Sequence, residues 1–363
     1  MELKLGKKES SNSMRLLVML LALGGVFLIY MSGSGEGDEL TPLTRQPTVT
    51  PTLDPVTATP AATMTIAPTA TEASPVAYGP TAEAASPTRV PLSIKSGYSV
   101  QSFNYKGLRR EYGLYIPESY NDVKAFPMLV AFHPLNATTE IFAIGLGWLA
   151  PAQEKQIIGV YPQGVMTPNE NGASWNALHC CGYAQQNNVD DIGFIRALVA
   201  NLKSRYNIDA KRIYAAGYSN GGDMAHYVAS EMSDVFAAVG EYAGAMGSST
   251  DTPQIVYRPP KNRVSVIKIH GKEDGVRPFD DGWDMWHTMR YVSSSDAMKF
   301  WAGVNGCSLT PTVSPIAGGT WATYEGCKDN TSVILILFDK ANHVYLPSAT
   351  RLITQFLLSQ AKQ

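Results

Sequence analysis

The 363-residue chain has little surplus charge and few cysteines. Its 29 Lys and Arg side chains are nearly balanced by 31 Asp and Glu, which gives a formal net charge of −2. Nucleic-acid-binding proteins usually carry a strongly basic face, so this composition argues against nucleic acid as a partner. There are only four cysteines, and no second Cys or His pair follows at the spacing of a zinc finger. The sequence therefore predicts neither a metal site nor a cofactor.

Long apolar runs are scarce, and the longest lies near the N-terminus. The uncharged residues 16–31 (LLVMLLALGGVFLIYM) follow Lys4, Lys7, Lys8 and Arg15 and precede small residues. This is the pattern of a secretory signal. The run is slightly shorter than the ~20 residues that span a bilayer, so residues 1–35 are either a cleaved signal peptide or a retained anchor. Both alternatives predict export, as a secreted protein or as a cell-surface protein tethered to the membrane through residues 16–31.

Large apolar side chains are almost missing from the segment that follows. Residues 41–91 contain 10 Pro, 13 Thr and 10 Ala. Such a segment cannot bury enough apolar surface to offset the entropy cost of ordering it. Residues 36–91 are therefore predicted to be a disordered linker, which either holds the rest of the protein away from the cell surface or serves only as a spacer.

From residue 92 the chain alternates between strand-like and helix-like stretches. Short apolar runs such as residues 127–133 and 264–269 are typical of strands buried on both faces, and residues 189–206 have helical periodicity. One helix is expected over residues 139–155. The alternation predicts an α/β domain over residues 92–363, with a mostly parallel central sheet and helices on both faces. Ligand sites in such sheets lie at the carboxyl ends of the strands.

One motif lies at such a strand end. Residues 217–221 (GYSNG) directly follow the expected strand 212–216 and begin an expected helix. This is a Gly-x-Ser-x-Gly sequence in the strand–turn–helix context of a nucleophile elbow. The sharp turn leaves no room for Cβ atoms beside the serine, which explains the glycines. The motif predicts that Ser219 is a nucleophile.

A serine hydroxyl needs a base to remove its proton, and on this type of fold the chain order is serine, acid, histidine. His343 lies in the loop after the last expected strand, residues 333–338. Asp274 follows the expected strand that ends at His270. The sequence therefore predicts His343 as the base and Asp274 as the acid that orients it. The weaker alternatives for the acid are Glu273, Asp280, Asp281 and Asp339.

The negative oxygen of a tetrahedral intermediate needs two backbone N–H donors. One is expected from Asn220, which follows the nucleophile. The other is expected from the loop after residues 127–133, where Pro134 has no N–H and Leu135 does. Trp175 and His133 are the candidate substrate-binding residues. The Trp175 ring could stack on an aromatic acid or a sugar, or could simply anchor its loop.

The cysteines are expected to form disulfides, because the count is even and the protein is predicted to be exported. Cys307 and Cys327 flank a segment containing Pro and Gly, so a loop-closing bond is expected there. Cys180 and Cys181 are adjacent, and the sequence leaves open whether they form a bond or remain two thiols.

Residues from about 92 to 361 resemble the secreted α/β-hydrolase esterases that include feruloyl esterases, acetylxylan esterases and polyhydroxybutyrate depolymerases. The resemblance is carried by residues 161–164 (YPQG), 174–176 (SWN), 180–181 (CC), 189–194 (VDDIGF), 217–222 (GYSNGG), 270–271 (HG), Asp274, Cys307 and His343. The sequence departs from the family pattern at two places. Residues 133–134 are His-Pro where the family usually has His-Gly, and residues 344–347 (VYLP) replace a Trp-Pro.

The resemblance implies an α/β-hydrolase fold and an extracellular serine esterase that uses no cofactor. Its expected substrate is a polymeric ester, either feruloyl or acetyl esters on plant polysaccharide or a polyhydroxybutyrate-type polyester. The alternatives are a peptidase or other acyl hydrolase of the same fold, and a non-catalytic, stalked polymer-binding module.

Overall fold

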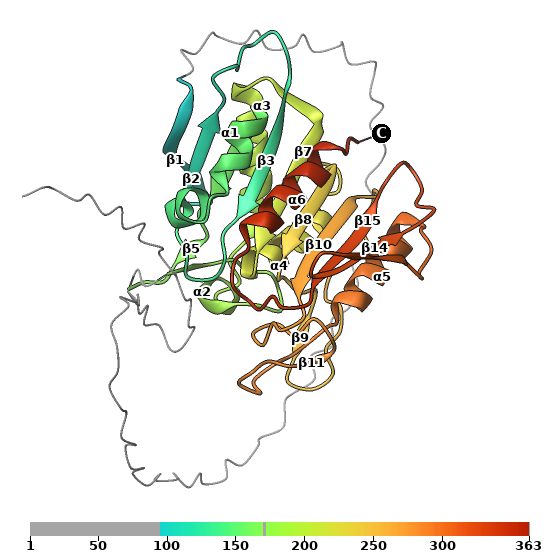
Figure 1. Ribbon diagram of the computed structural model, residues 1–363. Coiled ribbons are helices and arrows are strands. Elements are labelled where there is room, and N and C mark those ends of the chain that lie inside the picture. The colour runs from blue at the N-terminus through green and yellow to red at the C-terminus, as the bar shows by residue number, and fades with distance from the viewer. Residues whose placement is uncertain (1–94, 170–171, 363) are drawn as a thin grey trace, which may run out of the picture. The chain divides into compact units, whose positions relative to one another are not determined.

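The computed structural model of the protein describes residues 95–169 and 172–362 (Figure 1). The segments predicted as signal or anchor, residues 1–35, and as linker, residues 36–91, lie outside the described residues, and the domain boundary stays a prediction. Within the described part, no helix is both long enough and apolar enough to cross a membrane.

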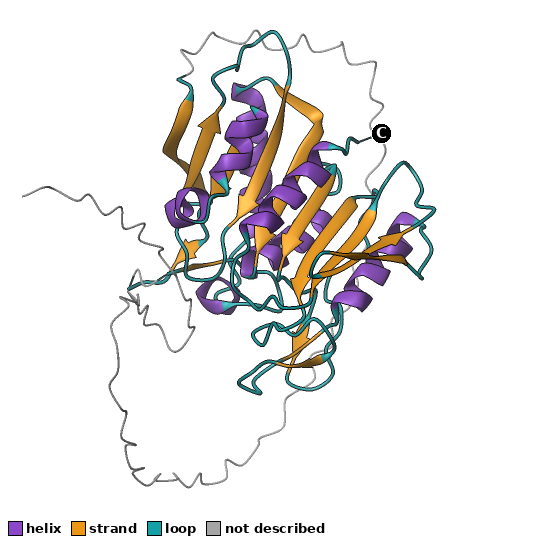
Figure 2. Cartoon of the chain, viewed as in Figure 1, coloured by secondary structure: helices purple, strands orange, loops and turns teal. Residues whose placement is uncertain are grey.

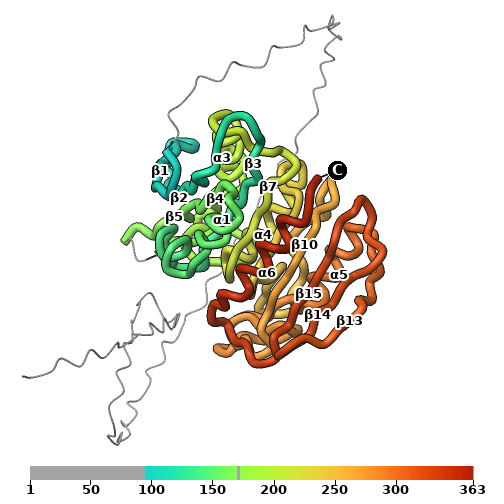
Figure 3. The backbone as a smooth tube through the Cα atoms, turned by 45° about the horizontal axis from the view of Figure 1, so that its top comes forward, coloured from blue at the N-terminus to red at the C-terminus, as the bar shows by residue number. Residues whose placement is uncertain are grey.

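A ten-stranded sheet runs through the described residues in the order β1-β2-β4-β3-β7-β8-β10-β15-β14-β13. The six strands from β4 to β15 in this order are parallel, and antiparallel strands flank them at both edges. Figure 3 shows β1 and β13 at opposite edges of the sheet. The strands are β1 (Gly97–Tyr105), β2 (Leu108–Ile116), β3 (Phe126–Phe132), β4 (Ile158–Pro162), β7 (Ile208–Tyr218), β8 (Ala238–Tyr242), β10 (Ser265–Gly271), β13 (Thr312–Ile316), β14 (Gly319–Tyr324) and β15 (Val333–Phe338).

Helices cover both faces of this sheet, and each face has its own hydrophobic core between sheet and helices (Figure 2). Side chains alternate along β3, so that Met128, Val130 and Phe132 enter one core and Leu129 and Ala131 enter the other. The first core packs against α3 (Asp191–Arg205), α4 (Asn220–Glu231) and α5 (Ser294–Asn305), and the second against the π-helix η1 (Ile141–Gly145), α1 (Leu149–Lys155) and α6 (Pro347–Leu358). The predicted fold class is confirmed.

The remaining elements are short and lie in the connecting loops. They are the helix α2 (Gly182–Gln186) and the two-residue strands β5 (Val165–Met166), β6 (Ala173–Ser174), β9 (Ser248–Ser249), β11 (Gly282–Trp283) and β12 (Arg290–Tyr291). The strands form two small sheets, β5 with β6 and β11 with β12 and β9.

The prediction of a single helix over residues 139–155 is wrong. Two short helices, η1 and α1, occupy this segment and are separated by three residues. Gly147 in that gap has a φ of 75°, which is a left-handed conformation that an α-helix cannot continue through. Two glycines within three positions also lower the helical propensity locally.

At the far edge of the sheet, a hairpin of β13 and β14 extends it beyond β15. A disulfide joins Cys307, which follows α5, to Cys327, which follows β14. The disulfide therefore closes the base of this hairpin. Sequence periodicity predicted neither α5 nor the hairpin.

Candidate active site

Ser219 lies at a sharp turn between the end of β7 and the start of α4, with φ 55° and ψ −122°. This strained backbone is held in part by the Ser219 N–H, which donates to the Tyr242 carbonyl of β8 at 2.9 Å. A Cβ on Gly217 would meet the Gly221 carbonyl, and a Cβ on Gly221 would meet the Phe132 carbonyl of β3. The two glycines of the motif are therefore needed for the turn to approach its own helix and the neighbouring strand.

The structure brings together Ser219, His343 and Asp274, which come from the ends of three different strands. The Ser219 Oγ lies 2.9 Å from His343 Nε2, and His343 Nδ1 lies 2.7 Å from Asp274 Oδ2. The carboxylate favours the tautomer with the hydrogen on Nδ1, which leaves Nε2 free to accept the serine proton. Ser219 is 8% exposed and the His343 side chain 17% exposed, so both remain reachable from solvent.

Asp274 is buried and held from three sides. Its Oδ1 accepts the N–H groups of Val276 at 3.0 Å and Arg277 at 2.8 Å, and its Oδ2 also lies 3.2 Å from His270 Nε2. Burial alone would raise the pKa of Asp274, but the charges and hydrogen bonds of His343 and His270 outweigh burial and hold this pKa well below its usual range. The carboxylate is therefore ionised at neutral pH.

The four alternative acids are exposed, and no hydrogen bond joins them to His343 among the described residues. Three of them form surface ion pairs: Glu273 with Lys340 at 3.0 Å, Asp339 with Lys272 at 2.7 Å and Asp281 with Arg290 at 3.1 Å. Asp280 is also exposed.

Two tyrosines, which sequence reasoning missed, hold the loop that carries His343. Tyr218 donates its hydroxyl hydrogen to the His343 carbonyl, and Tyr242 donates to the Val344 carbonyl at 2.8 Å. Their rings stack with centroids 5.4 Å apart. Burial raises the pKa of both phenols, so both stay protonated and can donate. The position of Tyr218 directly before the nucleophile was the one available sequence signal.

The two expected oxyanion donors flank Ser219. Asn220 is the first residue of α4, so its N–H has no carbonyl acceptor within the helix. No protein acceptor faces the N–H of Asn220 or Leu135 among residues 95–169 and 172–362. The Asn220 side chain accepts the Trp175 N–H at 2.8 Å and donates to the Trp175 carbonyl at 3.2 Å. This two-way bond ties the loop before α2 to the start of α4.

Trp175 and His133 are both fully buried, which leaves neither side chain a surface for substrate. The Trp175 indole N–H donates to the His133 carbonyl at 3.0 Å. His133 Nδ1 lies 2.8 Å from the Pro134 carbonyl, and its Nε2 accepts the Gly164 N–H at 2.8 Å. Burial lowers the pKa of His133 to about 4. The contacts correct the substrate-binding expectation: both residues anchor loops beneath the site.

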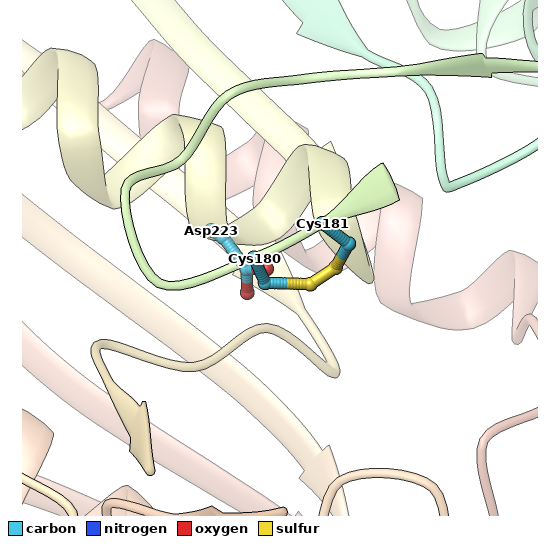
Figure 4. Close-up of side chains that lie close together, drawn as sticks. All are labelled: Cys180, Cys181 and Asp223. Atoms are coloured by element: carbon cyan, nitrogen blue, oxygen red, sulfur yellow. A yellow bond between two sulfur atoms is a disulfide. The ribbon is translucent and has the colours of Figure 1, made fainter. Parts of the chain in front are cut away.

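Cys180 and Cys181, whose pairing the sequence left open, form a disulfide (Figure 4). Asp223 of α4 lies beside them, and these three residues form a cluster of potential metal ligands within the described part of the chain. Both sulfur atoms are taken up by the disulfide, and Asp223 forms an ion pair with Arg277. The cluster therefore does not have the chemistry of a metal centre.

Residues 110–255 match the protein family described as "Esterase PHB depolymerase". This segment includes Ser219, Asn220 and Leu135 and ends before Asp274 and His343.

Two curated relatives and one solved structure are similar to the chain. It is 27% identical over 234 residues to "Feruloyl esterase B" of Piromyces equi, covering 62% of this chain and 41% of that protein. It is 26% identical over 200 residues to "Acetylxylan esterase" of Coprinopsis cinerea, covering 51% and 52%. The chain thus spans about half the length of these two relatives. The structure of an acetyl xylan esterase from Aspergillus awamori superposes with a TM-score of 0.52 at 17% identity, over 71% of this chain and 99% of that one, which shows a shared fold.

Proposed function

We propose that this chain, whose residues 110–255 match the family described as "Esterase PHB depolymerase", is a serine hydrolase of carboxylic esters. The observation that carries the proposal is the hydrogen-bonded series from Ser219 through His343 to the buried Asp274. A serine with a histidine in hydrogen-bond reach, oriented in turn by a third group, is the arrangement of an activated nucleophile.

In this proposal Ser219 Oγ attacks the ester carbonyl while His343 Nε2 takes its proton. The N–H groups of Asn220 and Leu135 stabilise the negative oxygen of the tetrahedral intermediate. The imidazolium, stabilised by Asp274, then gives the proton to the leaving alcohol, and an acyl group remains on Ser219. Water attacks this acyl-enzyme by the same route and releases the acid.

The proposed substrate is a polymeric ester outside the cell, with feruloyl or acetyl groups on plant polysaccharide or a polyhydroxybutyrate-type polyester as the candidates. The names of the relatives support the ester class. Exposed apolar side chains near the site support an extended substrate: Val344 follows His343, and the Met285 N–H donates to the carbonyl of Gly275, which follows Asp274. Two disulfides within the described residues favour an oxidising, extracellular compartment.

The test is a side-by-side assay of the purified protein on p-nitrophenyl acetate, methyl ferulate, acetylated xylan and polyhydroxybutyrate film. The Ser219→Ala variant is the matched control, because it removes one oxygen atom. We expect ester hydrolysis by the parent, loss of nearly all of it in the variant, and an acyl group on the Ser219 peptide by mass spectrometry after a rapid quench. Equal hydrolysis by parent and variant would contradict the proposal. Cleavage of peptide substrates faster than any ester would point to a peptidase.

A further inference from the structure

Arg277 has no role in the proposed reaction, yet its backbone contacts both the candidate acid and the buried histidine beside that acid. It lies three residues after Asp274 in the loop that follows β10. Its N–H donates to Asp274 Oδ1 at 2.8 Å, and its carbonyl lies 2.7 Å from His270 Nε2, which also faces Asp274. A displacement of Arg277 would therefore disturb two of the contacts that hold the carboxylate, its own N–H and His270.

The Arg277 side chain ties this loop to the helix that carries the nucleophile. The Arg277 side chain is 4% exposed, and its guanidinium forms an ion pair with Oδ1 of Asp223, a fully buried residue of α4. The Asp223 N–H donates to the Ser219 carbonyl at 3.0 Å, and Asp223 Oδ1 also accepts the Ala245 N–H at 2.7 Å. Acid and nucleophile are thus joined by a second route that does not pass through His343.

The other end of the guanidinium contacts the disulfide between adjacent cysteines. Arg277 Nη2 lies 3.2 Å from Cys180 Sγ and 3.4 Å from Cys181 Sγ, and the guanidinium carbon lies 5.7 Å from the centre of the Tyr291 ring. Figure 4 shows Asp223 directly beside this disulfide. The planar fork of an arginine can contact the carboxylate and the sulfurs at the same time, whereas a lysine presents a single point charge.

We propose that Arg277 is a positioning residue for Asp274. Its side chain binds Asp223 and the Cys180–Cys181 disulfide, and so fixes the loop after β10, which carries Asp274, relative to Ser219. The inference rests on the proposed function. It predicts that the geometry of the fork, and not only its positive charge, sets the strength of the contact between Asp274 and His343.

The pH dependence of the reaction distinguishes a role for the geometry of the Arg277 guanidinium from a role for its positive charge alone. The rate constant kcat/KM rises with pH as the base loses its proton. The low-pH side of this profile, its acid limb, therefore reports the pKa of His343. Removing a nearby cation would raise that pKa by Coulomb's law, whereas loosening the contact with Asp274 would lower it. The charged and titratable groups that face Asp274 are His343, His270, Arg277, Tyr218, Tyr242 and Tyr291.

Two variants keep the local charge balance and remove the fork. Arg277→Lys retains one positive charge, and Arg277→Met combined with Asp223→Asn removes one charge of each sign. In both we expect the acid limb of kcat/KM on p-nitrophenyl acetate to move down by about one pH unit. We expect kcat to fall by about tenfold to a hundredfold, since small misplacements of catalytic groups have effects of this size.

The matched control is Arg110→Met combined with Asp191→Asn. Arg110 and Asp191 form another ion pair with side chains 4% and 0% exposed, and Arg110 forms no hydrogen bond or ion pair with Asp274 among the described residues. This control should keep the acid limb of the parent, whether its melting temperature rises or falls.

A parent-like or upward-shifted acid limb in both Arg277 variants would overturn the inference. If the double variant fails to fold, Arg277→Lys decides alone by the same criterion. NMR titration of the His343 imidazole in the same proteins gives its pKa without any turnover. A parent that hydrolyses no ester would therefore refute the proposed function, while the NMR shift would still decide whether Arg277 positions Asp274.

Discussion

Tyr218 donates its hydroxyl hydrogen to the backbone carbonyl of His343, so the residue directly before the candidate nucleophile also holds the candidate base. The ring of Tyr242 stacks on that of Tyr218, and its hydroxyl donates to the Val344 carbonyl of the same loop. The elbow and the base are therefore connected by a short path, although they lie 124 positions apart in the chain.

We expect Tyr218→Phe to lower kcat on a small ester several-fold, while the protein stays folded. The variant keeps the ring stacking and loses one hydrogen bond, which contributes about 1 kcal/mol net. Tyr214→Phe is the control, because its hydroxyl donates to Gln360, outside the site. A similar loss of kcat in both variants would show that the effect is not specific to the His343 loop.

The three candidate residues should behave as one unit. Ser219→Ala and His343→Ala should each remove nearly all activity, and the double variant should be no worse than either, because losses within a triad do not add. Asp274→Asn should reduce kcat by orders of magnitude through the wrong imidazole tautomer. Glu273→Gln, which alters an exposed carboxylate that pairs with Lys340, should keep the activity of the parent. Full turnover by Asp274→Asn would show that the acid is assigned wrongly.

The parts of this molecule that the sequence predicted are those with local signals. The buried parallel strands are continuous apolar runs, and the elbow at residues 217–221 needs its glycines for a steric reason that is visible in the sequence. The helix α5 also had a local signal that was overlooked, since Ser293 caps it by accepting the Asp296 N–H at 3.0 Å. Arg277 and Tyr242 had none, because their roles come from contacts between segments far apart in sequence.

A boundary near Pro91 predicts that a truncated protein beginning there folds and hydrolyses small esters as fast as the full chain. The linker that precedes this boundary, residues 36–91, contains too few large apolar side chains to complete a core. Thermal unfolding measured by circular dichroism checks this prediction. Loss of a cooperative transition in the truncated protein would place part of the fold before residue 91.

Acid should destabilise the protein in a pH window set by its buried histidines. Burial lowers the pKa of His133 to about 4, so between pH ~6.5 and ~4 the unfolded state binds a proton that the folded state does not. The stabilisation is complete above pH ~6.5 and is lost as the pH falls toward 4, by up to ~3 kcal/mol for this one group.

The variant His133→Gln tests this window, because a glutamine oxygen can still accept the Gly164 N–H and does not titrate. Its free energy of unfolding, from urea titrations at several pH values, should fall less steeply between pH 6.5 and 4 than that of the parent. His179 has its pKa lowered to about 4 by burial as well, so some slope should remain in the variant. Identical slopes for parent and variant would exclude His133 as a contributor.

The disulfide between Cys307 and Cys327 should stabilise the fold without taking part in the reaction. It closes a loop of about 20 residues, which constrains the unfolded chain by roughly 3 kcal/mol. The hairpin that it closes includes β14, which pairs with β15, and His343 follows β15. The variant Cys307→Ser with Cys327→Ser should therefore melt at a temperature several degrees lower than the parent. Its activity should match that of the parent well below the unfolding transition and should be lost at a lower temperature than that of the parent. Parallel measurements of residual activity and of unfolding by circular dichroism check whether the two losses coincide. An equal melting temperature, or a lower kcat at temperatures where both proteins are fully folded, would contradict a purely stabilising role for this disulfide.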